Sequence, residues 1–310
     1  MDYTRIPQSI VIANGKGGVG KSTTCVNLAF EAARRGAPVT VLDFDPQATA
    51  IESVGIEDHD HGKSLLAACL GVGELAFYNT SEPNVRFIAS GEHLRRLANL
   101  SIVEGNGDPH HLARQVSNAI RPHLRPGEWL FIDCEPALGT HLTDAAFLFG
   151  EHLVGVTGFD KFEKKGVEKV LQRVLEIDRN DHPLINPMGI LFNNIPLASA
   201  KSKLAKETAW FDERMGGLMP VFKTFIRQAD KATKDSREAG LTASQLAELS
   251  ETADVPKWYE VIGTGQKTVS FAKNTPDLAD DYRRLADEIL ARRSPDDNII
   301  IDLATEAQHV

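Results

Sequence analysis

One short stretch, Gly15–Thr23, constrains the fold of this chain more than any other, because it reads Gly-Lys-Gly-Gly-Val-Gly-Lys-Ser-Thr. It fits the phosphate-loop pattern G-x-x-x-x-G-K-[ST] at all four fixed positions. The apolar run at 9–13 is typical of a buried strand, and residues 22–35 carry apolar side chains at helical spacing. A strand, this loop and a helix in succession predict a site for the phosphates of a nucleotide. A glycine-rich turn without a ligand is the alternative.

The residue types in this loop explain the prediction. Glycines allow backbone conformations that are closed to other residues, so successive N–H groups can point at one phosphate. The following helix directs the positive end of its dipole to the same place. We expect Lys21 to reach the β- and γ-phosphates and the Ser22 hydroxyl to bind Mg²⁺. The residues predicted to hold the nucleotide are Gly15, Lys16, Gly17, Gly18, Val19, Gly20, Lys21, Ser22 and Thr23.

The loop contains a second lysine, Lys16, that the general pattern does not require. Lys-Gly-Gly-Val-Gly-Lys-Ser-Thr resembles the deviant Walker A box of the ParA/MinD group of ATPases. In that family the early lysine crosses a dimer interface and touches the nucleotide of the partner subunit. The resemblance therefore implies ATP as the nucleotide and a catalytic role for Lys16. An ordinary solvated loop lysine is the alternative.

Two apolar stretches end in carboxylates. Residues 38–43 read as a buried strand that runs into Asp43-Phe44-Asp45-Pro46-Gln47, and residues 129–133 form an apolar strand that ends in Asp133. Open α/β sheets bind ligands at the carboxyl ends of their strands. The first box resembles the Asp-x-Asp-Pro-Gln of the ParA family, in which the second aspartate, here Asp45, lies beside Mg²⁺ and the attacking water. Asp-Pro is also a common turn, which is the alternative.

The family resemblance assigns further roles. Catalysis falls to Lys16, Lys21 and Asp45, and Mg²⁺ binding to Ser22, Asp45 and Asp133, the last as a Walker B carboxylate. The strand at 187–193 ends in Asn193, which matches the position where the family contacts adenine, although asparagine is also an ordinary turn residue. After Asp133 the family's Asp-Cys-Pro-Pro-Ser-Leu-Gly is altered, because Glu135 and Ala137 replace a proline and a serine.

The segment 199–240 differs in charge from the remainder of the chain. It contains nine Lys or Arg and six acidic residues, a net charge of +3, whereas the rest of the −9 chain carries −12. Its second half resembles the segment of ParA proteins that carries DNA-binding basic residues. A solvated helix face is the alternative. The candidate DNA-binding residues are Lys223, Arg227, Lys231, Lys234 and Arg237.

Composition limits the other possibilities. The 310 residues are 42% hydrophobic and 25% charged, and no apolar run is long enough to span a bilayer. The three cysteines form no C-x-x-C pair, so we do not expect an iron–sulfur cluster. Their small number indicates that the protein works in a reducing cytosol. We expect a single phosphate-loop ATPase domain over 1–293, with a helical insertion at about 55–126, and a short acidic tail at 294–310.

The alternation of strand and helix predicts an α/β fold with a doubly wound, mostly parallel sheet flanked by helices. The resemblance implies a cytoplasmic, nucleoid-associated partition ATPase with slow intrinsic turnover. It would dimerise on ATP·Mg²⁺, bind nonspecific DNA and be released when a ParB-like partner stimulates hydrolysis. One alternative is a ParA-like ATPase that positions a protein cargo. A MinD-like membrane switch would need a basic amphipathic C-terminal helix, and the tail is acidic.

Overall fold

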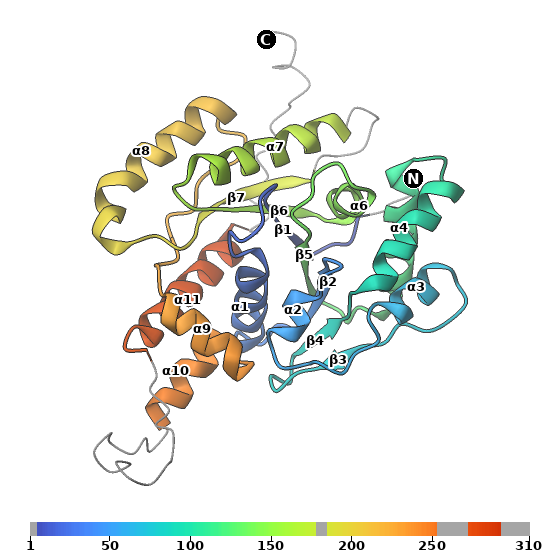
Figure 1. The fold of residues 1–310 in the computed structure, drawn as a ribbon, viewed down its shortest axis with the longest axis horizontal. Coiled ribbons are helices and arrows are strands. Elements are labelled where there is room, and N and C mark those ends of the chain that lie inside the picture. Colours follow the sequence, from blue (N-terminus) through green and yellow to red (C-terminus); the bar gives the residue numbers. More distant parts are fainter. Residues whose placement is uncertain (1–4, 178–184, 253–271, 293–310) are drawn as a thin grey trace.

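A computed structural model describes residues 5–177, 185–252 and 272–292. Its centre is one seven-stranded sheet with the order β3-β4-β2-β5-β1-β6-β7 (Figure 1). All neighbouring strands are parallel except β3, which pairs antiparallel with β4. This confirms the predicted fold class. The strands are β1 (Ser9–Ala13), β2 (Val39–Phe44), β3 (Tyr78–Asn79), β4 (Val85–Ile88), β5 (Trp129–Cys134), β6 (His152–Thr157) and β7 (Asn186–Phe192).

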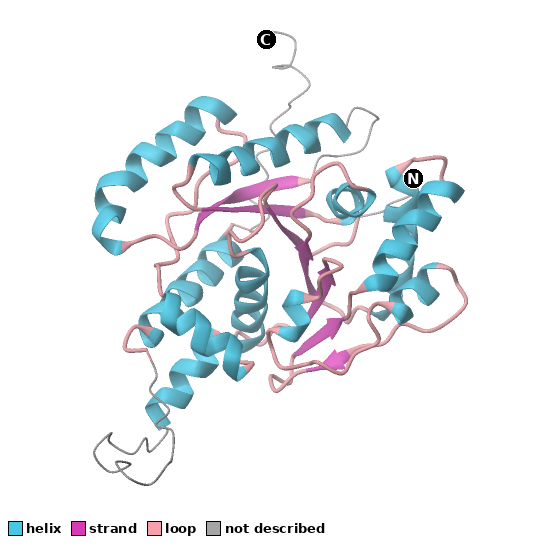
Figure 2. Ribbon diagram, in the orientation of Figure 1, coloured by secondary structure: helices cyan, strands magenta, loops and turns pink. Residues whose placement is uncertain are grey.

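Helices cover both faces of this sheet, which Figure 2 shows in magenta between them. The four inner strands β2, β5, β1 and β6 are buried on both faces and are strongly apolar, as parallel strands between two helical layers must be. One layer contains α1 (Lys21–Arg34), α2 (Thr49–Glu52), α9 (Asp230–Ala239), α10 (Ala243–Thr252) and α11 (Thr275–Ala291). The other contains α3 (Lys63–Cys69), α4 (Glu92–Glu104), α5 (Pro109–Ile120), α6 (His141–Phe149), α7 (Lys161–Ile177) and α8 (Leu197–Met215).

Each layer has its own hydrophobic core because successive side chains of a strand point to opposite faces. Ile10 and Ile12 of β1 pack with α1 and α11, whereas Val11 and Ala13 pack with the layer that contains α6 and α7. A short 3₁₀ helix, Arg121–His123, follows α5. No helix within the described ranges is long and apolar enough to cross a membrane.

The segment 55–126, expected as a helical insertion, contributes strands as well as helices. It contains α3, α4 and α5, but also β3 and β4, and β4 pairs with β2 inside the central sheet. This segment is therefore built into the sheet. The predicted tail 294–310 lies outside the described residues.

The order of the strands gathers the predicted site residues at one edge of the sheet. The strand β1 lies between β5 and β6, and β2 lies on the far side of β5, so the loops that leave β1, β2 and β5 open side by side. On the opposite side of β1, beyond β6, residues 221–227 run beside the end of β7. There the Ile226 N–H donates to the Phe192 carbonyl at 2.9 Å. This run leads the chain from α8 into α9, next to the loop after β1.

Candidate active site

The loop after β1 has the backbone geometry that phosphate binding requires. Gly18 and Gly20 have φ angles of +78° and +93°, in the left-handed region that favours glycine. A Cβ on Gly20 would overlap Asn193 Nδ2, so a side chain here would displace the Asn193 amide from the Val19 carbonyl. The first helical residue is Lys21, which leaves the N-terminal N–H groups of α1 directed at the loop.

Asn14 fixes the start of the loop, a role that the phosphate-loop motif does not include. Its Nδ2 donates to the Val156 carbonyl at 2.6 Å and to the Glu163 carbonyl at 3.0 Å, and its Oδ1 accepts from the Lys16 N–H at 2.8 Å. The side chain therefore ties the loop to β6 and α7. A buried asparagine one residue before the motif is the only sequence signal.

Lys16 is held within its own chain. Its Nζ lies 3.2 Å from Asp160 Oδ1 and 3.2 Å from Glu163 Oε1, at the start of α7, and its side chain is 40% exposed. Hydrogen bonds to Asp160 and Glu163 raise the pKa of the lysine. The reach of Lys16 into a second subunit remains a prediction, and it requires these two contacts to be exchanged.

Two carboxylates meet at the ends of β2 and β5. The register pairs Asp43 with Asp133, and both are fully buried. Asp43 is satisfied locally, because its Oδ1 accepts from the Asp45 N–H and its Oδ2 from Ala50 N–H and Ile51 N–H at 3.0 and 3.1 Å. Burial, together with the nearby charge of Asp133, raises the pKa of Asp43. Its role is therefore to anchor the turn that carries Asp45.

Asp133 differs from Asp43, since neither of its carboxylate oxygens has a hydrogen bond of acceptable geometry within the described structure. Burial raises the pKa of Asp133 to about 7, against the opposing effects of the Ser22 hydroxyl and the Lys21 ammonium. Buried polar groups without partners are rare and require an explanation. A divalent cation supplies one here.

The residues around Asp133 fit Mg²⁺, which prefers carboxylate, hydroxyl and phosphate oxygens. Ser22 follows β1 and Asp45 follows β2, the two strands that flank β5, and both side chains are half-buried. The Ser22 hydroxyl lowers the pKa of Asp133 and the charge of Asp45 raises it. Asp45 Oδ1 accepts from the Gln47 N–H at 2.9 Å, which leaves Oδ2 for other contacts. Bound Mg²⁺ would neutralise charge on the phosphates and on these carboxylates. The three predicted metal ligands are thus brought together.

Lys21 is buried beside this group, and its Nζ donates to the Lys16 carbonyl at 3.3 Å. Burial lowers the pKa of its ammonium, while the charge of Asp133 opposes that effect. Lys21, the first residue of α1, thus lies between the loop backbone that would hold the phosphates and the carboxylates that would hold the metal. This is the place that the motif predicts for a contact with the β- and γ-phosphates.

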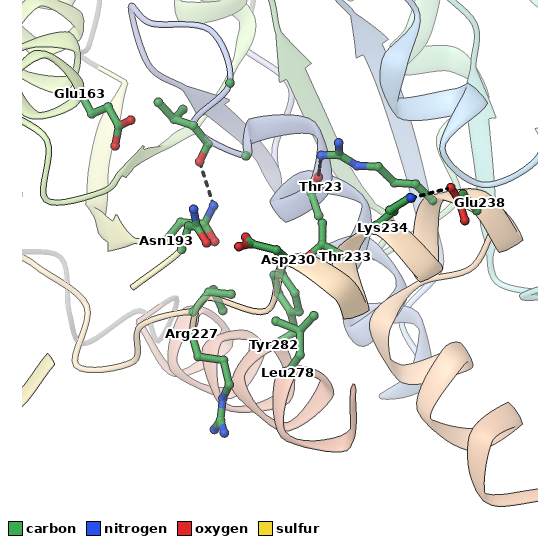
Figure 3. A pocket seen from close by; sticks show the side chains of 16 residues that line it. Thr23, Glu163, Asn193, Arg227, Asp230, Thr233, Lys234, Glu238, Leu278 and Tyr282 are labelled. Carbon is green, nitrogen blue, oxygen red and sulfur yellow. Dashed lines mark hydrogen bonds and ion pairs between the residues drawn. The ribbon is translucent and has the colours of Figure 1, made fainter. Parts of the chain in front are cut away.

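A cavity of about 490 Å³ opens on the other side of the phosphate loop (Figure 3). Asn193 stands at its wall and its Nδ2 donates to the Val19 carbonyl at 2.8 Å. Leu278 and Tyr282 of α11 give it an apolar side, and Tyr282 is fully buried. Apolar walls with a few polar groups suit a nucleoside. The sequence predicted Asn193 here but gave no sign of the α11 wall.

The five basic residues proposed for DNA separate into different environments. Lys223, Lys231, Lys234 and Arg237 are exposed. Arg227 is not available in the same way: its side chain is 14% exposed and binds two carboxylates of α11. In Figure 3 its guanidinium points away from the phosphate loop. Arg227 therefore holds the 221–227 run against α11, which is a structural role that charge alone did not reveal.

The altered loop after Asp133 forms its own contacts. The Thr140 hydroxyl donates to Glu135 Oε1 at 2.5 Å, and burial raises the pKa of Glu135. Glu135 is thereby tied to the cap of α6, whose Thr140 Oγ1 also accepts from the Thr143 N–H. Neither the acidic loop at 58–61 nor any other part of the described chain contains a group of three His, Cys, Asp or Glu side chains that could hold a metal ion.

Comparison with known proteins shows the family of the chain. The sequence profile of the AAA_31 family, described as an AAA domain, matches residues 7–187. The chain belongs to this family. A curated relative, the chromosome-partitioning ATPase Soj of Thermus thermophilus, is 28% identical over 292 residues, which cover 91% of this chain and 95% of Soj. Several other curated relatives are matched over about two thirds of their own length, such as 67% for one from Pseudomonas putida.

Solved structures share the fold. An ATP complex of a McdA variant from Cyanothece has a TM-score of 0.69 at 19% identity, covering 92% of this chain and 96% of McdA. Cobyrinic acid a,c-diamide synthase from Mycobacterium smegmatis, with a bound ATP analogue and magnesium, has a TM-score of 0.60 at 18% identity, covering 93% of this chain and 96% of the other. The chain is a P-loop ATPase of the ParA/MinD type, and ATP and Mg²⁺ fit its site.

Proposed function

We propose that this protein is a DNA-partition ATPase that dimerises on ATP and binds nonspecific DNA as the ATP dimer. A ParB-like partner would stimulate hydrolysis and release the DNA. The observation that carries the proposal is the match to the chromosome-partitioning ATPase Soj over nearly the full length of both chains. The early lysine of the loop, Lys16, supports the dimer, because a trans contact is its role in the resembling family.

In this proposal each residue of the site has a part in hydrolysis. The loop amides and Lys21 hold the phosphates, and Ser22, Asp45 and Asp133 hold Mg²⁺. Asp45, half-buried at the end of β2, is the group proposed to orient the attacking water. Turnover would be slow until a partner completes the electrostatic environment of the transition state. An Asp45→Ala variant that hydrolyses ATP at the normal rate would remove Asp45 from this role.

The DNA step is tested by binding to a fluorescent duplex of random sequence without nucleotide, with ADP and with ATPγS, across a salt series. We expect binding only with ATPγS. The double variant Lys231→Ala/Lys234→Ala removes exposed charges from α9. A lysine that contacts a DNA phosphate in both subunits of the dimer contributes about 1.8 to the slope of log affinity against log salt concentration. The matched control is Lys169→Ala, an exposed lysine of α7 in the opposite helical layer.

The outcomes separate the parts of the proposal. Binding that needs ATPγS and weakens in the α9 variant but not in Lys169→Ala supports the DNA step. Binding that ignores the nucleotide contradicts the coupling, and no binding in any state contradicts the DNA step itself. Light scattering of the same samples tests dimerisation, and ATPγS-induced dimerisation of Lys16→Ala would remove the trans contact. Slow ATP hydrolysis that requires Mg²⁺ is expected throughout.

A further inference from the structure

Arg237, predicted from the sequence to bind DNA, makes its contact in the structure with the phosphate loop. Its Nη2 donates to Thr23 Oγ1 at 2.9 Å, across 214 residues of sequence. The dashed line that ends on Thr23 in Figure 3 marks this bond. Arg237 lies near the end of α9, and both it and Thr23 line the cavity beside the loop. One end of α9 is thereby placed against the nucleotide site.

The charge of this arginine is not used elsewhere in the described structure. Arg237 has no carboxylate oxygen within 4.0 Å among the residues placed, whereas Arg227 binds Asp277 and Asp281. Lys234 also has an acidic partner, because its Nζ lies 3.6 Å from Glu238 Oε1. A neutral hydroxyl satisfies one donor of a guanidinium that has five, and the others match the oxygens of a phosphate. The side chain is therefore suited to an anion at this place.

The position of the cavity shows which phosphate that anion is. Its lining contains Gly18, Val19, Gly20 and Thr23 of the loop, together with Asn193 and Tyr282, but not Lys21, Asp45 or Asp133. The cavity thus lies on the nucleoside side of the loop, and the Mg²⁺ cluster on the other. Since Lys21 takes the β- and γ-phosphates, the α-phosphate is the group that comes nearest to Thr23.

We propose that Arg237 binds the α-phosphate of the nucleotide, so that α9 closes the phosphate loop from the nucleoside side. The assignment rests on ATP binding at this site and is independent of the DNA step. It makes Arg237 a nucleotide-binding residue, unlike Lys223 and Lys231, which do not line the cavity. Because ATP and ADP both carry an α-phosphate, the contact is the same in the two states.

The test measures binding of a fluorescent ADP to the full chain in Mg²⁺, with competition by unlabelled ADP and ATPγS. Arg237→Ala is expected to weaken ADP and ATPγS by the same factor, about tenfold or more, as for loss of a charged hydrogen bond. Arg237→Lys keeps the charge and restores part of the affinity. The matched control is Arg96→Ala, an arginine of α4 whose side chain is 60% exposed and which lies outside the cavity. Its affinities should equal those of the wild type.

A second readout separates phosphate binding from a looser pocket. Loss of a cation makes the affinity for ADP less dependent on salt, whereas loosening alone leaves the salt dependence unchanged. The nucleotide-free Arg237→Ala protein should unfold within about 2 °C of the wild type, because its hydrogen bond to Thr23 is exposed.

Three results would overturn the proposal. Unchanged affinities in Arg237→Ala remove the residue from the site, and a loss confined to ATPγS places it at the γ-phosphate instead. Equal losses of affinity for ADP and ATPγS with an unchanged salt dependence would mean that Arg237 only stabilises the loop. A wild-type protein that binds neither nucleotide contradicts the ATP site itself, and this result is distinct from a failure of Arg237 alone.

Discussion

Replacing Arg227 by alanine is expected to destabilise the fold by about 3 kcal/mol. The guanidinium bonds Asp281 through Nε at 2.6 Å and Nη2 at 2.9 Å, and Nη1 lies 2.9 Å from Asp277. Asp281 is 2% exposed, and removing one partner of a buried ion pair costs about 3–5 kcal/mol. Asp281 keeps the Arg227 N–H and Arg284 as partners, so the lower end of that range applies. Asp277 is 62% exposed and adds little.

The assay is urea unfolding at pH 7, followed by circular dichroism, with Lys223→Ala as the control. Lys223 is exposed four residues earlier, and its backbone N–H donates to Glu288 whatever the side chain is. With a slope of about 3 kcal/mol per molar urea, the midpoint of Arg227→Ala falls by about 1 M, whereas the control stays within about 0.2 M. Arg227→Lys, which cannot bond Asp281 through two nitrogens, should fall between them.

A double-mutant cycle with Asp281→Asn isolates the pair and should give a coupling energy of about 2 kcal/mol. The reasoning is refuted if Arg227→Ala unfolds with the same midpoint as Lys223→Ala. A variant that keeps full stability but loses most of its affinity for DNA would return Arg227 to the DNA-binding residues.

Three further perturbations follow from the site and the sheet. Gly20→Ala should weaken nucleotide binding, because its Cβ would displace the Asn193 side chain from the loop. Gly36→Ala, at a φ of +87° in open space, should cost only about 1 kcal/mol of stability. Calorimetric titration with ADP and urea unfolding distinguish the two, and unchanged binding in Gly20→Ala would contradict the steric argument. Burial raises the pKa of Glu128, but hydrogen bonds from two arginines and Thr40 outweigh that effect and lower the pKa to about 2. The stability that ionised Glu128 adds is therefore present above about pH 4.5 and is lost as the pH falls toward 2. Glu128→Gln should therefore cost about 2 kcal/mol at pH 7 and little at pH 2; an equal cost at both pH values would count against this assignment. Asp133→Asn should remove the Mg²⁺ dependence of ATP binding, which a Mg²⁺ titration measures. It should not lower the melting temperature of the nucleotide-free protein, because the carboxylate has no hydrogen bond to lose. A large loss of stability in thermal unfolding would show that Asp133 is a structural group.

The sequence predicted those parts of the site that are local. The phosphate loop and Asp45 follow buried strands, and Asp133 lies at the end of one, so a short motif and an apolar run suffice to place each of them. Their convergence follows from the parallel order of β1, β2 and β5, which the alternation of strand and helix already implied. For these residues the same few sequence positions predict both the chemistry and the place in the fold.

The rest depended on contacts between distant segments, which spacing does not encode. Asn14 reaches Val156 and Glu163, and Arg237 reaches Thr23. A positive charge in sequence is compatible with solvent, with DNA or with an internal partner. The carboxylates that bind Arg227 lie on α11, 50 and 54 residues later, and only the packing of α11 against the 221–227 run decides the matter.

The α-phosphate contact has a consequence for how ATP controls the surface of α9. A ligand shifts an equilibrium only through a difference in its interactions with the two states. Arg237 would meet the same α-phosphate in ATP and in ADP, so it reports occupancy and cannot distinguish the two nucleotides. That distinction must arise at the γ-phosphate, and the proposed trans contact of Lys16, which bonds Asp160 and Glu163 in this structure, is the candidate for it. At saturating ATPγS, Arg237→Ala should therefore bind DNA as the wild type does, whereas Lys16→Ala should not. A DNA-binding defect of Arg237→Ala that persists at saturation would show that the arginine contacts the DNA itself.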